Sequence, residues 1–242
     1  MSAAGSPRLV DVRRTPPRTL LTAALLMPAV HLVAAGLSGA VTPVTPSAAA
    51  LTLVVFILGA IPEELGWTAY ATGPMQERFG VTGAGMAIGA VWAGWHVVPW
   101  LSMGHSWRWV AWQSAVTVAM RIIMGHLFRM SGRSAATALL FHAVSNASLE
   151  ILPGAVEPRR TAIVATLLIL LAAGVTKREP EYIATAGLPD TLTKADEGLN
   201  GAGQPVPLVH GLVGVGRAPL TLGYGLMFLS GRRASSPPAP RA

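Results

Sequence analysis

The sequence contains no cysteine, which excludes disulfide bonds, thiolate metal sites and a cysteine nucleophile. Charged residues are also scarce, at 12% of the 242 residues, and lysine is nearly absent, since only Lys177 and Lys194 occur. Hydrophobic residues make up 52% of the chain, and the mean hydropathy is +0.51. This balance argues against a soluble enzyme, which needs more charge on its surface, and against a disordered chain. It favours a multi-pass helical membrane protein.

Apolar runs along the chain predict an all-α fold, a polytopic transmembrane bundle of about six helices. A span needs about 20 apolar residues, so the short second run must include Glu63 and Glu64 or end at them. We expect a basic cytoplasmic segment at 1–18, a transmembrane domain at 19–175 and a Gly/Pro-rich tail at 176–242. The expected apolar runs are Thr19–Leu37, Ala48–Ile61, Val81–Leu101, Trp107–Phe128, Ser134–Leu152 and Thr161–Val175.

The tail differs in composition from the rest of the chain. Its last residues, Ser235–Ala242, are rich in Pro, Ser and Ala, which is typical of disorder. Leu208–Leu229 is mildly apolar but holds five glycines, so the sequence leaves open whether it forms a seventh helix.

The distribution of basic residues predicts the orientation in the membrane. With the N-terminus inside, nine basic residues fall in inner segments and three in outer turns, which favours two cytoplasmic termini in a bacterial inner or plasma membrane. The net charge of +7 then indicates contact with anionic membrane lipids rather than with nucleic acid. The inner residues are Arg8, Arg13, Arg14, Arg18, Arg78, Arg129, Arg133, Lys177 and Arg178; the outer residues are Arg108, Arg159 and Arg160. The Arg159-Arg160 pair opposes this orientation locally.

Polar side chains inside the apolar runs are the main functional signal. An ionisable group in hydrocarbon costs about 2.5–3.5 kcal/mol on insertion scales, so it usually faces the interior of the bundle. We single out Glu63, Glu64, His96, His142 and Asn146, which lie on three separate runs. Such residues can meet only inside the bundle.

Glu63 and Glu64 are the sharpest of these signals. Two adjacent carboxylates resist being charged together, so one of the two carboxyl groups tends to hold its proton more strongly. A carboxyl group that gains and loses a proton near neutral pH suits general acid or base chemistry. Trp67 and Thr68 follow four residues after Glu63 and Glu64, so Glu63 gains an apolar neighbour and Glu64 a hydroxyl. The two glutamates are therefore expected to take different roles. The alternative is a solvated pair at the inner membrane interface.

The histidine motifs are weaker when taken singly. Trp92 and His96 are four residues apart and share a helix face, and so do His142 and Asn146. A lone buried histidine is more often a hydrogen-bonded core residue than a ligand. A histidine and a carboxamide on one face can donate to an oxyanion or bridge two helices.

Taken together, these motifs resemble the family of intramembrane CAAX proteases and bacteriocin-processing enzymes, called CPBP or Abi. Its pattern is Glu-Glu-x-x-x-Arg, then Phe-x-x-x-His, then His-x-x-x-Asn or Asp, on successive helices. The matching segments here are Glu63–Thr68, Trp92–His96 and His142–Asn146, and the family-like core is 48–175.

The resemblance implies hydrolysis of a peptide bond at the membrane. By the family's mechanism, Glu63 and His96 activate a water, His142 and Asn146 stabilise the oxyanion, and Glu64 is a structural or secondary acid. Members are usually described as metalloproteases, and Glu63, His96 and His142 would then hold Zn²⁺. A metal-free mechanism uses the same residues.

Two residues depart from the family pattern. Thr68 stands where the family has arginine, and Trp92 stands where it has phenylalanine. Arg121 lies inside the fourth run, where it either snorkels to the cytoplasmic surface or supplies the missing cation.

Two other functions remain open. The loss of the motif arginine suits a catalytically weak relative that acts as a membrane scaffold or bacteriocin-immunity protein. Alternatively, Glu63, His96 and His142 would form the proton relay of a small proton-coupled transporter. For a protease in a bacterial host, we expect a membrane-associated peptide or protein as substrate.

Overall fold

The computed structural model describes residues 12, 15–39, 45–152 and 157–178. Leu208–Leu229, for which the sequence leaves a seventh helix open, and nearly all of the tail lie outside these residues. The described part is all-helical, as predicted. Its elements are α1 (Pro17–Ser38), α2 (Pro46–Glu64), a π-helical stretch η1 (Leu65–Thr72), α3 (Gly73–Ser102), α4 (Trp107–Met130), α5 (Ala135–Ile151) and α6 (Pro158–Lys177).

Helix boundaries follow from ordinary capping residues. Pro17, Pro46 and Pro158 open α1, α2 and α6, at a position where the missing N–H costs nothing. The Ser106 side chain accepts a hydrogen bond from the Trp109 backbone N–H at 3.3 Å and so caps α4. Ser134 caps α5 in the same way. Five of the six expected runs match an α-helix within a few residues at each end, and the third run, Val81–Leu101, lacks the first eight residues of α3.

The chain from α2 to α3 is the least regular part. Pro62 lies near the end of α2 and cannot donate a backbone hydrogen bond, and the π-helical stretch begins three residues later. Gly80 then adopts φ 68°, which breaks α3 into two pieces. The predicted span Val81–Leu101 coincides with the second piece. This irregular segment carries the two glutamates into the bundle.

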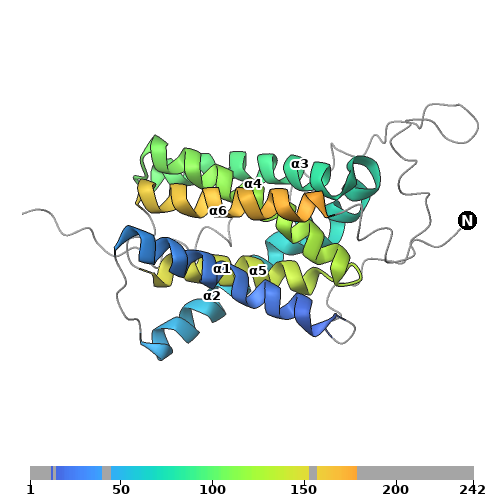
Figure 1. The fold of residues 1–242 in the computed structure, drawn as a ribbon, viewed down its shortest axis with the longest axis horizontal. Helices are drawn as coiled ribbons and strands as arrows, with labels where there is room; N and C mark the ends of the chain where they lie inside the picture. The colour runs from blue at the N-terminus through green and yellow to red at the C-terminus, as the bar shows by residue number, and fades with distance from the viewer. Residues whose placement is uncertain (1–11, 13–14, 40–44, 153–156, 179–242) are drawn as a thin grey trace, which may run out of the picture. The chain divides into compact units, whose positions relative to one another are not determined.

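The helices pack in two groups, visible in Figure 1. Helix α4 packs against α3 and α6, while α5 packs against α1 and α2. Contacts of α4 with α5, and of α1 with α6, join the groups. The main core between them includes Met27, Met124, Phe141 and Leu168, each at most 2% exposed. The η1 stretch contacts α3, α4 and α5, so it lies where the groups meet.

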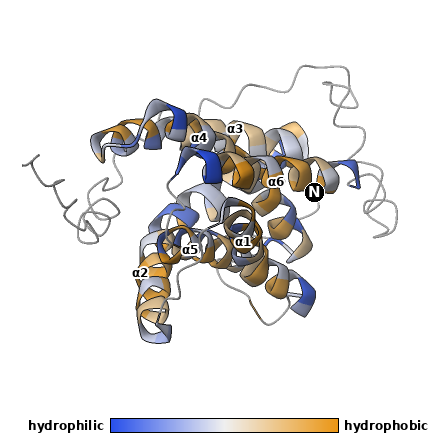
Figure 2. Cartoon of the chain, turned by 60° about the vertical axis from the view of Figure 1, so that its left-hand side comes forward, coloured by the Kyte–Doolittle hydropathy of each residue, from blue (hydrophilic) through white to orange (hydrophobic). Residues whose placement is uncertain are grey.

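Apolar side chains also cover much of the outside. Leu25, Leu51, Val98 and Leu170 are each more than half exposed, and Figure 2 shows apolar colouring on the outer faces of the helices. By length and composition, three described helical segments suit a membrane crossing: Pro17–Ser38, the continuous stretch Pro46–Ser102, and Pro158–Lys177. These features indicate a membrane protein. Helices α4 and α5 fall outside that criterion, although both pack in the bundle.

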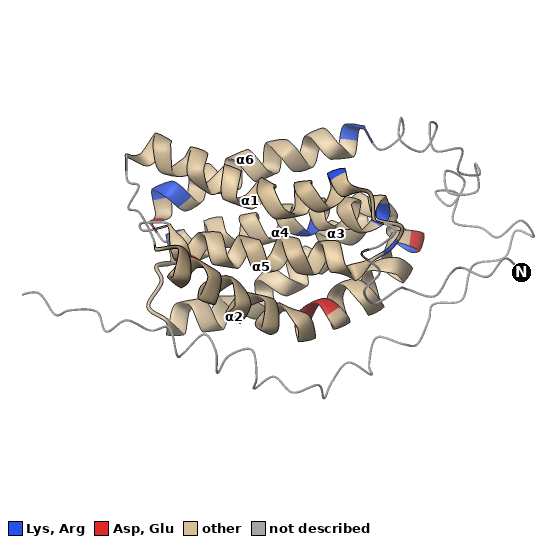
Figure 3. Cartoon of the chain, turned by 90° about the horizontal axis from the view of Figure 1, so that it is seen from below, with Lys and Arg blue, Asp and Glu red and all other residues tan. Residues whose placement is uncertain are grey.

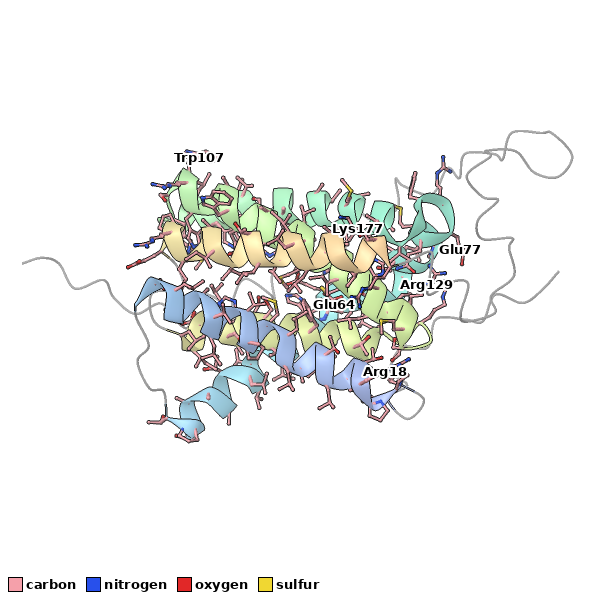
Figure 4. All side chains as sticks on the ribbon, viewed as in Figure 1. Arg18, Glu64, Glu77, Trp107, Arg129 and Lys177 are labelled. Carbon is pink, nitrogen blue, oxygen red and sulfur yellow. The ribbon has the colours of Figure 1, made fainter. Side chains whose placement is uncertain are left out.

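Charged residues gather mainly near the helix ends (Figure 3). In Figure 4, Arg18, Glu77, Arg129 and Lys177 lie towards one end of the helices and Trp107 lies at the other. Arg160 is an exception, since it is 1% exposed and its Nε donates to the Ser38 hydroxyl at 3.0 Å. Because Arg160 is buried, it does not act as an ordinary loop charge against the predicted orientation.

Candidate active site

The three sequence motifs converge with α4 in the interior of the bundle. Glu64 ends α2 and lies between the helix ends in Figure 4. Arg121 of α4 and His142 of α5 bond to it, and Trp92 of α3 packs against both of these side chains. The structure therefore joins motifs that are about 80 residues apart in sequence, as His142 and Glu64 are separated by 78 positions.

Glu64 is the most completely bonded residue of the site. Its side chain is buried, with the residue 2% exposed, and both carboxylate oxygens accept hydrogen bonds. The Thr68 hydroxyl donates to Oε2, as the four-residue spacing predicted. His142 Nδ1 lies 2.9 Å from Oε1. A buried carboxylate needs such partners, so Glu64 fits a structural role in the site.

Arg121 supplies the cation that the motif lacks. Its Nη2 donates to Glu64 Oε1 at 2.7 Å and its Nη1 donates to Oε2 at 3.0 Å, which makes a bidentate pair. Nη1 also lies 3.3 Å from the Thr68 hydroxyl oxygen. Arg121 is 3% exposed, so the alternative that it snorkels to the surface is wrong. The alternative that Arg121 supplies the missing cation is confirmed.

Glu63 has different surroundings from its neighbour. It is half-buried, and its Oε2 accepts a hydrogen bond from the Trp92 indole N–H at 2.8 Å. The Trp92 ring is buried and packs edge-on against the His142 ring, with centroids 4.9 Å apart. The buried tryptophan therefore links Glu63 to the interior, while the half-buried carboxylate keeps partial access from outside.

His96 packs edge-on against the same Trp92 ring that bonds Glu63, with ring centroids 5.6 Å apart. It is half-buried, and its Nδ1 lies 2.8 Å from the Trp92 carbonyl oxygen. Because a carbonyl only accepts, Nδ1 carries the proton, and Nε2 of the neutral ring is an acceptor. The ring is thus oriented to receive a hydrogen bond from a water on its Nε2 side.

His142 and Asn146 take different positions although they share one helix. His142 is 2% exposed and belongs to the Glu64 cluster, which consists of Glu64, Thr68, Arg121 and His142. Asn146 is half-buried and takes no part in the hydrogen bonds described for that cluster. It lines a small cavity with His31, Gln113 and Thr161, from α1, α4 and α6. Of the predicted site residues, Asn146 is the one that the structure leaves one turn away.

The donor set bears on the predicted Zn²⁺ site. The Nδ1 atoms of His96 and His142 both contact protein acceptors, an arrangement that is common for metal-binding histidines. However, within the described ranges no three His, Asp or Glu side chains are placed to hold one ion together. Glu63, His96 and His142 do not form a ligand set in this arrangement, so we derive no step through a metal.

Two glycines that the motifs did not include position Arg121. A Cβ on Gly85 would lie 2.6 Å from the Ile122 Cα, and a Cβ on Gly89 would lie 2.8 Å from the Val118 Cα. These glycines therefore let α3 and α4 approach closely. Their four-residue spacing is itself a sequence signal for helix packing in membranes.

Part of the chain is similar to a known protein family. Residues 45–148 match the family model described as type II CAAX prenyl endopeptidase Rce1-like. The family resemblance is confirmed. The Rce1-like region contains α2, η1, α3, α4 and most of α5, and hence every residue of the Glu64 cluster.

A curated relative supports the same assignment. The protein named CAAX prenyl protease 2 from Methanococcus maripaludis is 26% identical over 132 residues. The alignment covers 51% of this chain and 48% of that protein. The chain therefore spans about half the length of this relative.

Proposed function

We propose that this chain is an intramembrane endopeptidase of the CAAX-protease and bacteriocin-processing type. The observation that carries the proposal is the division of the glutamate pair: Glu64 is held by Arg121, and Glu63 stays half-buried and bonded to Trp92, whose ring packs against His96. The Rce1-like match supports the same reaction class. The substrate class is a membrane-associated peptide or protein.

The proposed reaction begins with a water between Glu63 and His96. Glu63 takes one proton from this water, while the His96 Nε2 accepts a hydrogen bond from the other. The water oxygen attacks the scissile carbonyl carbon and forms a tetrahedral oxyanion. Glu63 then passes its proton to the leaving nitrogen, the C–N bond breaks, and a carboxylic acid and an amine are released.

Oxyanion stabilisation falls to α5. Glu64 accepts two guanidinium hydrogen bonds and so acts as a carboxylate, which makes His142 Nδ1 a donor to it. His142 Nε2 can therefore donate to an oxyanion only when the ring is doubly protonated. We assign a second donor to the Asn146 amide, which needs no ionisation; its side chain lines the neighbouring cavity and has to turn towards the oxyanion to donate.

Two alternatives lose support. The reading as an inactive scaffold or immunity protein drew on the missing motif arginine, and Arg121 now occupies the place of that cation beside Glu64. The transporter reading needs a chain of exchangeable protons. Of the relay residues Glu63, His96 and His142, His142 is instead bonded to Glu64, whose carboxylate is paired with an arginine that does not release its proton.

A cleavage assay with purified protein in liposomes tests the proposal. Two quenched fluorescent peptides serve as probes, one with a C-terminal prenyl anchor and one with a transmembrane anchor. We expect cleavage of at least one by the wild-type protein and none by Glu63→Gln. Equal cleavage by the two proteins would sink the proposal, and so would the lack of any cleavage by the wild type while it catalyses proton-coupled uptake.

We further propose that the protein has six spans and that both termini are cytoplasmic. The clustering of Arg18, Arg129 and Lys177 towards one end of the bundle supports this orientation. Reporter fusions after Val175 test it. An extracellular signal from that position contradicts the proposal.

A further inference from the structure

We propose that Arg121 and Trp92 are positioning residues that together replace the motif arginine: Arg121 fixes Glu64 and, through the Trp92 ring, aligns Glu63. The inference rests on the proposed function for its catalytic part. It links the two departures from the family pattern, Thr68 and Trp92, which then become parts of one alternative arrangement.

Arg121 makes two kinds of contact at once. The edge of its guanidinium group forms the bidentate pair with Glu64, at 2.7 and 3.0 Å. Its Cζ also lies 4.0 Å from the centre of the Trp92 ring, which is a cation–π contact. One side chain from α4 therefore fixes a carboxylate of α2 and an indole of α3.

Trp92 carries the alignment on to Glu63. The indole N–H donates to Glu63 Oε2 at 2.8 Å. A phenylalanine at this position, as in the family pattern, offers a ring for stacking but no N–H for this bond. The tryptophan therefore holds the proposed base by a contact that the usual motif residue does not provide.

Thr68, which stands in the place of the family's arginine, leaves room for Arg121 beside Glu64. The family's arginine at this position would come from the same segment as Glu64, whereas Arg121 comes from α4. Thr68 is small, and its hydroxyl lies 3.3 Å from Arg121 Nη1 and donates to Glu64 Oε2. An arginine at both positions would bring two cations to one buried carboxylate. Arginine at position 121 therefore goes with a neutral residue at position 68, and arginine at position 68 goes with a neutral residue at position 121.

Close packing of α3 and α4 lets Arg121 reach both Glu64 and Trp92. A Cβ on Gly89 would lie 3.2 Å from the Arg121 Cβ. Any larger side chain at position 89 therefore pushes Arg121 away from Trp92. The substitute arginine thus depends on a glycine in the facing helix.

A reciprocal exchange tests the inference. The variants are Arg121→Ala, Thr68→Arg and the double variant, with exposed Arg108→Ala as the control on the same helix. We expect each single change to lower the thermal midpoint by roughly 10 °C, because it leaves a buried charge unpaired or crowds two cations. We expect the double variant to recover most of that loss, and Arg108→Ala to match the wild type.

A second variant tests the alignment of Glu63. We expect Trp92→Phe to keep the thermal midpoint near that of the wild type, because the stacked ring remains. We expect kcat to fall by about 10²-fold with little change in KM, as a small misplacement of a catalytic group does. Unchanged kcat in Trp92→Phe overturns the alignment step.

The outcomes separate this inference from the proposed function. Wild-type stability and cleavage in Arg121→Ala overturn the inference alone, and so does a double variant no better than its single parents. If the wild-type protein cleaves nothing, the proposed function fails. The thermal midpoints then still decide whether Arg121 replaces the motif arginine, because they need no activity.

Discussion

Glu63 and Glu64 are neighbours in the sequence, but their side chains point into two different surroundings. Glu64 is buried and accepts hydrogen bonds from Arg121 and Thr68, with His142 at 2.9 Å. Glu63 is half-buried, and the hydrogen bond described for it comes from Trp92. The comparison suggests that one glutamate organises the site and the other is left available for chemistry.

The difference has a physical cause in the local backbone. Consecutive residues of a helix point about 100° apart. Glu64 therefore faces α4 and α5, while Glu63 faces α3. The π-helical stretch that follows brings Thr68 under Glu64. A pair of identical side chains thus acquires two roles from position alone.

Removing the carboxylate of Glu63 is expected to have the largest effect on activity. We expect Glu63→Gln to lower kcat by about 10²–10⁴-fold, the usual contribution of a general base. The fold should survive, because the glutamine amide oxygen can still accept the Trp92 hydrogen bond. The measurement is the cleavage rate per folded enzyme in liposomes. Near wild-type turnover would leave the scaffold reading ahead.

Glu64 is expected to respond in stability. We expect Glu64→Gln to cost about 3–5 kcal/mol, because Arg121 stays buried without its counter-charge. The exposed pair of Glu77 and Arg133, at 3.1 Å, offers a matched control, and Glu77→Gln should cost at most about 1 kcal/mol. The free energy of unfolding in detergent compares the two. Equal losses would mean that burial does not distinguish them.

Asn146 tests how far the site extends along α5. We expect Asn146→Ala to lower kcat by about 10²–10³-fold, as the loss of one oxyanion donor does. Gln113 lines the same small cavity from α4, so Gln113→Ala controls for a change in packing. If both variants lose stability equally and keep kcat, Asn146 is a packing residue of that cavity and has no part in the oxyanion site.

Much of this arrangement was predictable from residue types and spacing. The apolar runs predicted the helices, and the spacing of Glu64 and Thr68 predicted their hydrogen bond. The contact of Arg121 with Glu64 was one of two alternatives for an arginine inside an apolar run, and it was suggested by two facts, the missing cation in the motif and the position of Arg121. Both facts express the same cost of an unpaired charge in hydrocarbon.

Other features depend on geometry that sequence spacing does not contain. The hydrogen bond from Trp92 to Glu63 needs the relative rotation of α2 and α3, which the π-helical stretch sets. Asn146 shares a helix face with His142, yet it lines a cavity towards α1 and α6 because its contacts depend on neighbouring helices. The predicted metal ligands likewise have the right chemistry without the required mutual placement.

The smallest expected effect concerns the contact between α3 and α4, the helix that carries Arg121 to Glu64. A Cβ on Gly85 would lie 2.6 Å from the Ile122 Cα, which is backbone and cannot rotate away. We expect Gly85→Ala to cost about 1–3 kcal/mol, the usual cost of overpacking. Gly94 lies in the same helix, and a Cβ there would meet no atom of a neighbouring element within 4 Å. Gly94→Ala should therefore be neutral or stabilising by up to about 1 kcal/mol.

The two glycine variants also separate stability from alignment. Because Gly85→Ala moves α4, it should shift Arg121 away from Trp92 and lower kcat as well as the free energy of unfolding. Gly94→Ala leaves that contact in place, and kcat should stay within about twofold of the wild type, since surface substitutions usually act within about ±0.5 kcal/mol. Tryptophan fluorescence melts and liposome cleavage rates measure both quantities. If Gly85→Ala loses stability but keeps kcat, the position of α4 matters for folding and the alignment of Glu63 depends on α3 alone.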